Sequence, residues 1–254
     1  MHRGSALFAG VGLLGLLMLA STAWGAADVQ LPGVDITLGS SAKPSTQVAS
    51  ALKIFLALTV LSLGPAILIA VTSFTRIIIV LSMLRHAVGM PETPPNVVLI
   101  ALALFLTLFV MMPVAKQIGD EAWQPFTKGE LDAGQALDKA MVPLREFMIR
   151  QTREQDMALM VELSNSPVPQ TAEDVSSVQL IPAFMLSELK SAFQIGFVVF
   201  VPFLLIDLLV SSVLMSMGMF MVPPVVISLP IKVLMFVLID GWNLVVRSLL
   251  GSFQ

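Results

Sequence analysis

The sequence predicts an all-α, membrane-associated protein made of helical hairpins, and three observations support this fold class. Hydrophobic residues make up 56% of the 254 residues and charged residues only 12%, whereas a soluble domain has typically about 45–50% and about 25%. The apolar residues lie in long blocks, and the mean hydropathy of the chain is +0.90. No segment shows the strict apolar–polar alternation of a half-buried β-strand.

The first 25 residues have the pattern of a secretory signal peptide. Arg3 provides a positive start, residues 7–20 form a short apolar core, and the small residues at 23 and 25–27 offer a cleavage site. This core is shorter than the roughly 20 residues of a membrane span, and an uncleaved first helix is the alternative. Residues 26–50, rich in Pro, Gly, Ser and Thr, would then form a loose segment on the far side of the membrane.

Four apolar blocks follow, and we expect them to form two helical hairpins. The blocks cover residues 51–84, 97–114, 191–221 and 225–250. The first two would form a hairpin at 51–114, and the last two a hairpin at 191–254. As one continuous helix the first block would be about 51 Å long, against a hydrocarbon core of about 30 Å. It is therefore either broken at Pro65 or projects beyond the bilayer.

Residues 115–190 are more polar and predict a helical extracytoplasmic domain. With the mature N-terminus outside, the first hairpin would return the chain to the outer side, in agreement with the positive-inside rule at the hairpin turn. Leu144, Phe147 and Met148 recur at helical spacing. Pro143 suits the start of that helix.

Motifs for catalysis or cofactor binding are missing from the sequence. It contains no GxSxG, HExxH or P-loop pattern. There is no cysteine, and His2 and His86 are the only histidines, so a thiolate or His-based metal cluster is excluded. A net charge of −3 does not favour a nucleic-acid partner. We expect no enzymatic activity, and no catalytic, cofactor-binding or metal-binding residues.

Charged residues within or beside the apolar blocks are candidate functional residues. They are Arg76, Glu188, Lys190, Asp207, Lys232 and Asp240. A charge that faces lipid costs about 2.5–3.5 kcal/mol on insertion scales, so such residues usually pair within a bundle or line a water-filled path. A structural ion pair is one interpretation and a proton or ion relay is another. The alternating signs of Glu188, Lys190 and Asp207 favour contacts with neighbouring subunits.

Four methionines lie within seven residues, just before a pair of prolines. They are Met215, Met217, Met219 and Met221. Gly218 and the prolines predict a turn at this place. Thioether side chains are flexible and polarizable, and they adapt to irregular surfaces. The segment is therefore either a loosely packed hairpin tip or, repeated around an oligomer, a deformable seal.

Short motifs with specific spacing are distributed from about residue 52 to the C-terminus. They are FTRIIIVLS at 74–82, PPN at 94–96, LREFM at 144–148, QTRE at 151–154, IPAF at 181–184, SELKSAFQIGF at 187–197, PFLLID at 202–207 and DGW at 240–242. Together they resemble the family of the flagellar biosynthetic protein FliP and its injectisome counterparts. The segment VGMPE at 88–92 departs mildly, because the family more often has polar residues there.

The resemblance implies a structural subunit of a type III protein export gate. Members of this family form a pentameric ring with the smaller membrane proteins FliQ and FliR, within a larger export apparatus of the bacterial inner membrane. Unfolded flagellar subunits pass through the central channel of this ring, which lies within the flagellar basal body. Much of the chain would lie on the periplasmic side, including residues 26–50 and 115–190, with the rest in contact with lipid and partner subunits.

The resemblance also implies roles for individual residues. A methionine-rich loop helps to close the channel in this family, and this role maps onto the four methionines at 215–221. Phe147 resembles a residue at the family's inner constriction.

Two alternatives remain open from the sequence. The near one is the export-gate subunit of a virulence injectisome, against which the signal peptide favours the flagellar branch. The distant one is a small ion channel or secondary transporter, although the inverted repeats of many transporters are not visible.

Overall fold

The computed structural model describes residues 44–164 and 169–253, which form helices joined by short loops, with no β-strand among them. The predicted all-α fold class is confirmed for this part of the chain. The predicted signal peptide at 1–25 and most of the predicted segment at 26–50 lie outside the described residues. Both remain predictions, and so does assembly into a ring.

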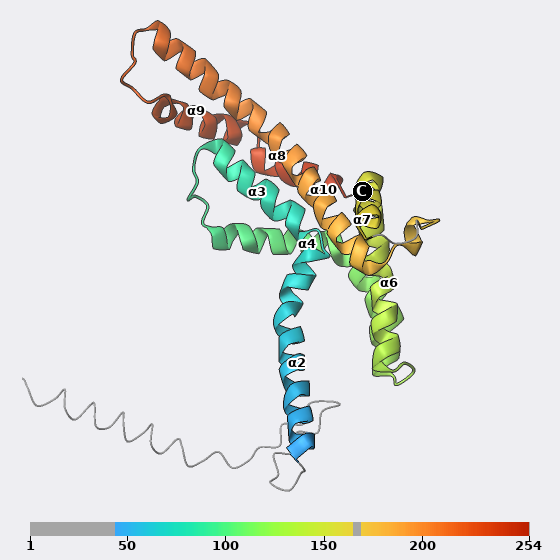
Figure 1. The fold of residues 1–254 in the computed structure, drawn as a ribbon. Helices are drawn as coiled ribbons and strands as arrows, with labels where there is room; N and C mark the ends of the chain where they lie inside the picture. Colours follow the sequence, from blue (N-terminus) through green and yellow to red (C-terminus); the bar gives the residue numbers. More distant parts are fainter. Residues whose placement is uncertain (1–43, 165–168, 254) are drawn as a thin grey trace, which may run out of the picture. The chain divides into compact units, whose positions relative to one another are not determined.

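Helices of very different lengths follow one another along the chain (Figure 1). They are α2 (Pro44–Ala70), α3 (Phe74–Val88), α4 (Asn96–Ile118), the π-helical turn η2 (Gly119–Trp123), α5 (Gln124–Thr127), α6 (Ala133–Gln151), α7 (Glu154–Leu163), the 3₁₀ turn η3 (Ala172–Asp174), α8 (Ser177–Ser216), α9 (Pro224–Leu238) and α10 (Gly241–Gly251).

The described chain divides into two units within α2, after Leu63. In the first unit, α2 carries large apolar side chains that are exposed, among them Phe55 and Leu58. The second unit, residues 64–253, contains all the candidate functional residues. The core and the sites below belong to this second unit.

The first apolar block is broken, but not at Pro65. This proline lies inside α2, which continues to Ala70, and the chain then bends by 74° before α3. The hydroxyls around the break hydrogen-bond to the backbone: Thr72 Oγ1 accepts from the Phe74 N–H at 3.5 Å, and Thr75 Oγ1 donates to the Ile69 carbonyl at 3.3 Å. Such local bonds compete with the helical ladder. Of the two alternatives that the sequence left open, a break at Pro65 is wrong, because the break comes several residues later, after Ala70.

The last apolar block is also two helices rather than one. α9 and α10 meet at a 66° bend. Asp240 occupies this bend with φ of 50°, a left-handed conformation that Asp adopts more readily than most residues. Its side chain is exposed. The sequence pattern places Asp240 inside a continuous apolar block. In the structure, Asp240 instead lies at the break between two helices.

The main core forms where α3 packs along α8 (Figure 1). Ile77, Val80, Leu81 and Leu84 recur at helical spacing on α3 and are buried. On α8 the facing positions are small, and a Cβ atom added to Gly196 would lie 2.3 Å from Met83 Sδ. Small residues on one helix thus allow the two helices to approach closely.

A second core lies between α6, α7 and the beginning of α8. Its buried residues include Phe147, Met148, Met157, Val161, Leu180 and Phe184. The predicted helical spacing in this region is confirmed, but Pro143 lies inside α6 and does not start it. The start is a capping box, in which Asp132 Oδ1 accepts from the Gln135 N–H at 2.9 Å and Gln135 Oε1 accepts from the Asp132 N–H at 3.2 Å.

Two described stretches, Asn96–Thr127 and Ser177–Ser216, are long and apolar enough to cross a membrane, and the two bent pairs could raise this number to four. α8 has 40 residues, which corresponds to about 60 Å of helix. It runs through the predicted boundary at residue 190 without a break, and α4 runs past residue 114. The division at those two positions has no helix end to mark it and remains a prediction.

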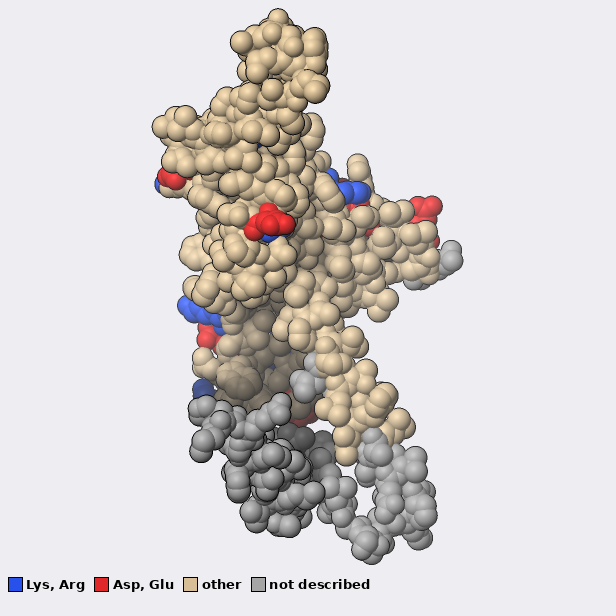
Figure 2. All heavy atoms as spheres, turned by 90° about the vertical axis from the view of Figure 1, so that its left-hand side faces the viewer, with Lys and Arg blue, Asp and Glu red and all other residues tan. Residues whose placement is uncertain are grey.

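The surface of these helices is largely uncharged. On the face drawn in Figure 2, Lys, Arg, Asp and Glu side chains are few and separated by wide uncharged areas. Exposed side chains on the apolar helices include Phe105, Phe197, Leu208, Val226 and Leu238. This distribution suits helices surrounded by lipid or by other apolar chains rather than by water.

Candidate functional sites: internal ion pairs and a methionine-rich loop

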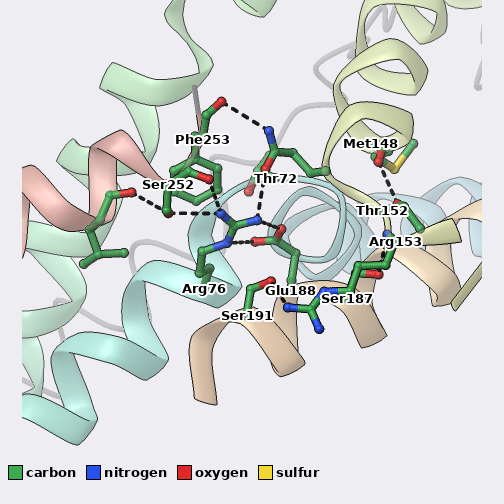
Figure 3. Close-up of polar contacts among 12 residues, drawn as sticks. Thr72, Arg76, Met148, Thr152, Arg153, Ser187, Glu188, Ser191, Ser252 and Phe253 are labelled. Atoms are coloured by element: carbon green, nitrogen blue, oxygen red, sulfur yellow. Dashed lines mark hydrogen bonds and ion pairs between the residues drawn. The ribbon is translucent and has the colours of Figure 1, made fainter. Parts of the chain in front are cut away.

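The guanidinium of Arg76, in the first turn of α3, is buried inside the described chain. It forms a two-point ion pair with Glu188 of α8: Nε donates to Oε2 at 3.0 Å, and Nη2 donates to Oε1. The two side chains are 4% and 0% exposed. Figure 3 shows the guanidinium facing the carboxylate edge to edge, which is the geometry in which this pair binds most strongly.

The remaining N–H groups of Arg76 bind two other segments of the chain. Nη1 donates to the carbonyl of Ser252 at 2.8 Å and to its hydroxyl at 3.0 Å, and Nη2 donates to Gln151 Oε1 at 3.0 Å. The ring of Phe253 lies against the guanidinium, 3.9 Å from Cζ to the ring centroid. All five donors of the arginine are thus used, and they join α3, α6, α8 and the residues after α10.

A second ion pair joins α7 to the same turn of α8 as the first. Asp156 is 1% exposed, its Oδ1 accepts from Lys190 Nζ, and its Oδ2 accepts from the Ser187 hydroxyl at 2.7 Å. The backbone N–H of Arg153 donates to the same Ser187 oxygen at 3.0 Å. Ser187 and its neighbour Glu188 therefore tie both α7 and α3 to a single turn of α8. Figure 3 shows Ser187 beside Arg153 and Glu188 beside Arg76.

The surroundings of Asp156 hold its pKa below the ordinary value of 3.8. Burial alone would raise the pKa, because a charged carboxylate loses its hydration. The hydrogen bonds from Lys190 and Ser187 and the positive charges of Lys190 and Arg153 outweigh this effect. Asp156 is therefore an anion at neutral pH and a fixed partner for Lys190.

A third ion pair lies farther along α8 and joins it to α9. Lys232 Nζ donates to Asp207 Oδ2 at 2.6 Å and to the carbonyl of Ala87 at 3.3 Å. Ala87 stands near the end of α3, where helix carbonyls have no partner within their own helix. Lys232 thus connects the hairpin of α8 and α9 to the end of α3.

Most of the predicted charges therefore have partners within the chain. The carboxylate of Glu188 is fully enclosed by its pair with Arg76 of the same chain, and its expected contact with a neighbouring subunit remains a proposal. Lys190 and Asp207 are also paired, but their side chains remain 44% and 35% exposed. Their role between subunits remains a proposal. The partners Asp156, Gln151 and Ser252 were not predicted, since they come from distant parts of the sequence and no local pattern marks them.

The methionine-rich segment forms the turn between α8 and α9, as predicted. α8 ends at Ser216, and Gly218 takes a φ of 76°. The N–H groups of Gly218 and Met219 donate to the carbonyls of Met215 and Leu214, both at 3.0 Å. This is the arrangement in which a helix ends at a glycine, and Pro223 and Pro224 lead into α9.

The four methionine side chains point away from the core of the chain. Met219 is 39% exposed and Met221 is 96% exposed, and Met215 and Met217 lie between these values. Phe220, in the same turn, is also exposed. The tip of the hairpin therefore presents a flexible apolar surface that the single chain does not cover.

Phe147 lies in a different setting from the methionines. Its ring is 4% exposed and packs edge-on against Phe184, with 5.9 Å between ring centroids. In this conformation Phe147 is a core residue, and its predicted place at a channel constriction remains a proposal. Among the described residues, no group of three His, Cys, Asp or Glu side chains is placed to hold a metal ion.

The fold and its sites define a class of protein: a helical membrane protein with paired internal charges and an exposed apolar hairpin tip. Residues 57–249 match the model of the FliP family. The chain is 51% identical to the flagellar biosynthetic protein FliP of Pectobacterium carotovorum, over 94% of this chain and 91% of that protein.

Two further relatives carry the same name. The Bacillus subtilis protein is 50% identical over 86% of this chain and 98% of its own length, and the Caulobacter vibrioides protein is 47% identical over 94% and 89%. The chain therefore belongs to the FliP family.

Proposed function

We propose that this chain is a subunit of the flagellar type III export gate and forms part of the channel through which unfolded flagellar subunits leave the cytoplasm. The observation that carries this proposal is the exposed methionine-rich tip of the α8–α9 hairpin, in a chain that belongs to the FliP family. Since the relatives are named as flagellar proteins, the flagellar apparatus is favoured over a virulence injectisome.

The chemistry of the tip suits a passage for polypeptides. An exported chain presents side chains of every size, so a rigid opening that fits one of them would obstruct others. Thioethers rotate about several bonds and pack against surfaces of varied shape. Met215, Met217, Met219 and Met221 would line the closed channel and part around a moving chain.

Ion-pair and hydrogen-bond contacts fix the base of the hairpin, whereas the side chains at its tip are exposed. Lys232 binds Asp207 on α8 and the carbonyl of Ala87 on α3. Closure at the tip could therefore change without loss of the helix packing below it. Phe147 would contribute to a constriction only after leaving its contact with Phe184.

The exposed apolar helices suit contact with partner chains as well as with lipid. We propose a homo-oligomer, a pentamer by family resemblance, that assembles with FliQ and FliR in the larger export apparatus of the inner membrane. Residues 26–50 and 115–190 would lie on the periplasmic side after removal of residues 1–25. The role is structural: the proposal includes no catalysis, cofactor or nucleic acid.

Complementation with crosslinking tests the proposal. The chain is produced in a flagellated bacterium that lacks its own FliP-family protein, with a photoreactive amino acid at Met219 and a flagellar subunit stalled during export. We expect secretion of flagellar subunits to return and the stalled chain to crosslink at Met219. The control position is Leu137 on α6, which is also exposed.

Restored secretion with equal crosslinking at both positions would contradict the channel role of the tip. A chain that reaches the membrane in normal amount and restores no secretion would contradict the export role itself.

A further inference from the structure

A cleft between α4, α6 and the residues at and after the end of α10 shares Phe147 and Phe253 with the sites described above, but its interior has no role in them. Its volume is about 260 Å³, and its walls include Phe109, Pro113, Phe147, Leu250, Phe253 and Arg150. This is less than the roughly 300–1,000 Å³ of clefts that enclose a drug-sized ligand. The cleft has room for one apolar chain of a larger molecule but not for the whole of it.

An exposed apolar strip on α4 leads into this cleft. Phe105, Leu108, Phe109 and Met112 recur at helical spacing, and each of them is more than half exposed. The strip belongs to Asn96–Thr127, one of the two helical stretches that are long and apolar enough to cross a membrane. In a membrane, acyl chains would therefore run along this strip.

Positive charge appears at the end of this strip. Arg150 of α6 lines the cleft, is exposed, and forms no salt bridge with any described residue. Glu146, one turn earlier on α6, forms no salt bridge with Arg150. Lys116, in the last turn of α4, is exposed as well. Guanidinium groups bind phosphate oxygens through two parallel hydrogen bonds.

Along the surface, the apolar strip is followed by the apolar cleft and then by the cations. An anionic phospholipid has the same order, with apolar acyl chains followed by a negatively charged headgroup. On the cytoplasmic side of membranes, basic pockets between helices bind anionic headgroups, and the same ion pairing would operate at Arg150 on either side. We propose that this cleft holds one acyl chain of an anionic phospholipid, with the phosphate bound by Arg150. The lipid would then cover Phe253, whose ring lies against Arg76. This inference does not depend on the export role.

Lipid retention by the full chain tests the proposal. The protein is reconstituted with equal parts of phosphatidylglycerol and phosphatidylcholine, extracted in mild detergent, and the bound lipids are counted by native mass spectrometry. We expect the protein to retain more phosphatidylglycerol than phosphatidylcholine. Arg150→Gln should retain about fivefold less of it, the factor that corresponds to roughly 1 kcal/mol for one basic residue at an anionic lipid.

Three further variants make the test specific. Arg150→Lys should keep the preference, since it keeps the charge. Arg247→Gln removes an exposed arginine of α10 that does not line the cleft and should retain lipid as the wild type does. Val110→Trp places a large ring in the cleft and should reduce retention of phosphatidylglycerol.

Equal retention by the wild type and by Arg150→Gln, both with unchanged helix content, would overturn the proposal. Equal retention of the two lipids by the wild type would do the same. If Val110→Trp lowers the yield of oligomer but leaves lipid retention unchanged, a neighbouring subunit fills the cleft and the lipid proposal is wrong.

Discussion

Arg76 and Glu188 are 112 positions apart in the sequence, yet their side chains form the most buried ion pair of the described residues. A buried pair loses the hydration of both charges, and it is favourable only if the remaining donors and acceptors are satisfied. Here every N–H group of Arg76 has a partner. The pair therefore fixes the position of α3 against α8 without leaving an unpaired donor on the arginine.

Removing one member of this pair should destabilise the protein strongly. We expect Arg76→Leu to lower the free energy of unfolding by about 3–5 kcal/mol, because the Glu188 charge would be left buried without a partner. The measurement is thermal unfolding of the purified protein in detergent, together with the amount of the variant in membranes.

A double variant separates charge from packing. Arg76→Leu combined with Glu188→Leu should recover part of the loss, since it leaves no buried charge. Arg247→Gln, at an exposed position of α10, should unfold as the wild type does. A double variant that is less stable than either single variant would show that the pair contributes more than its desolvation costs.

The Asp156–Lys190 pair should make stability depend on pH in the acid range. The pKa of Asp156 is lowered in the folded state, so its ionised form stabilises the fold above the unfolded pKa of about 4. That contribution is lost as the pH falls through the lower, folded pKa. Unfolding followed between pH 6 and pH 2 measures this loss.

The variant Asp156→Asn should be less stable than the wild type by about 1–2 kcal/mol at neutral pH, the cost of losing a charge-assisted hydrogen bond at a buried position. This difference should shrink as the pH falls, because the wild-type carboxylate becomes protonated. Asp138→Asn, at an exposed position of α6, is the matched control. A difference that stays constant down to pH 2 would contradict this explanation.

The bend between α9 and α10 should not tolerate a side chain at Gly241. A Cβ atom there would lie 2.1 Å from Phe236 Cε2, and Phe236 itself is held between Phe203 and Trp242, with ring centroids 6.2 and 5.5 Å away. We expect Gly241→Ala to lower the free energy of unfolding by about 1–3 kcal/mol through overpacking.

Gly251, in the same helix, provides the control. A Cβ atom at Gly251 meets nothing within 4 Å, so Gly251→Ala should change the free energy of unfolding by less than about 0.5 kcal/mol. Both variants are compared by thermal unfolding under identical conditions. Equal stability of the two variants would show that the aromatic rings move aside easily.

The helices were predictable from the sequence because long apolar blocks and helical spacing are local signals. The two bends were less visible. The break after Ala70 depends on the hydroxyls of Thr72 and Thr75 rather than on Pro65, and the bend at Asp240 depends on a left-handed residue beside a glycine. Hydrogen bonds from hydroxyl groups and single residues in the left-handed conformation hardly change the pattern of apolar residues, so that pattern does not locate the bends.

The ion pairs were predictable only as a class. The cost of charge in an apolar helix indicates that Arg76, Asp207 and Lys232 need partners, but it does not say which partners. Glu188 was assigned to a subunit contact because alternation of sign cannot distinguish a partner in the same chain from one in another. Asp156 was not predicted because it lies in a more polar helix, where a carboxylate is common and does not indicate a buried ion pair.

Replacing the methionines of the hairpin tip should open the closed channel to ions. Met215, Met217 and Met219 are exposed at the tip, and several symmetric copies would bring many thioethers together. An apolar constriction of this kind blocks ions because water leaves it. Changing all three to alanine should widen it and raise ion leakage, while the ion pair of Lys232 with Asp207 keeps the hairpin in place. Membrane conductance of the assembled complex measures the effect.

The control for this experiment replaces exposed apolar residues of α9, Val226, Leu234 and Val237, with alanine. These residues lie outside the turn, so leakage should stay at the wild-type level if the tip alone forms the seal. Membrane levels of the complex must be equal in all variants, because loss of assembly would also change the current. Unchanged leakage in the methionine variant at normal levels would place the seal elsewhere, and the methionines would then serve only to pack the hairpin tip.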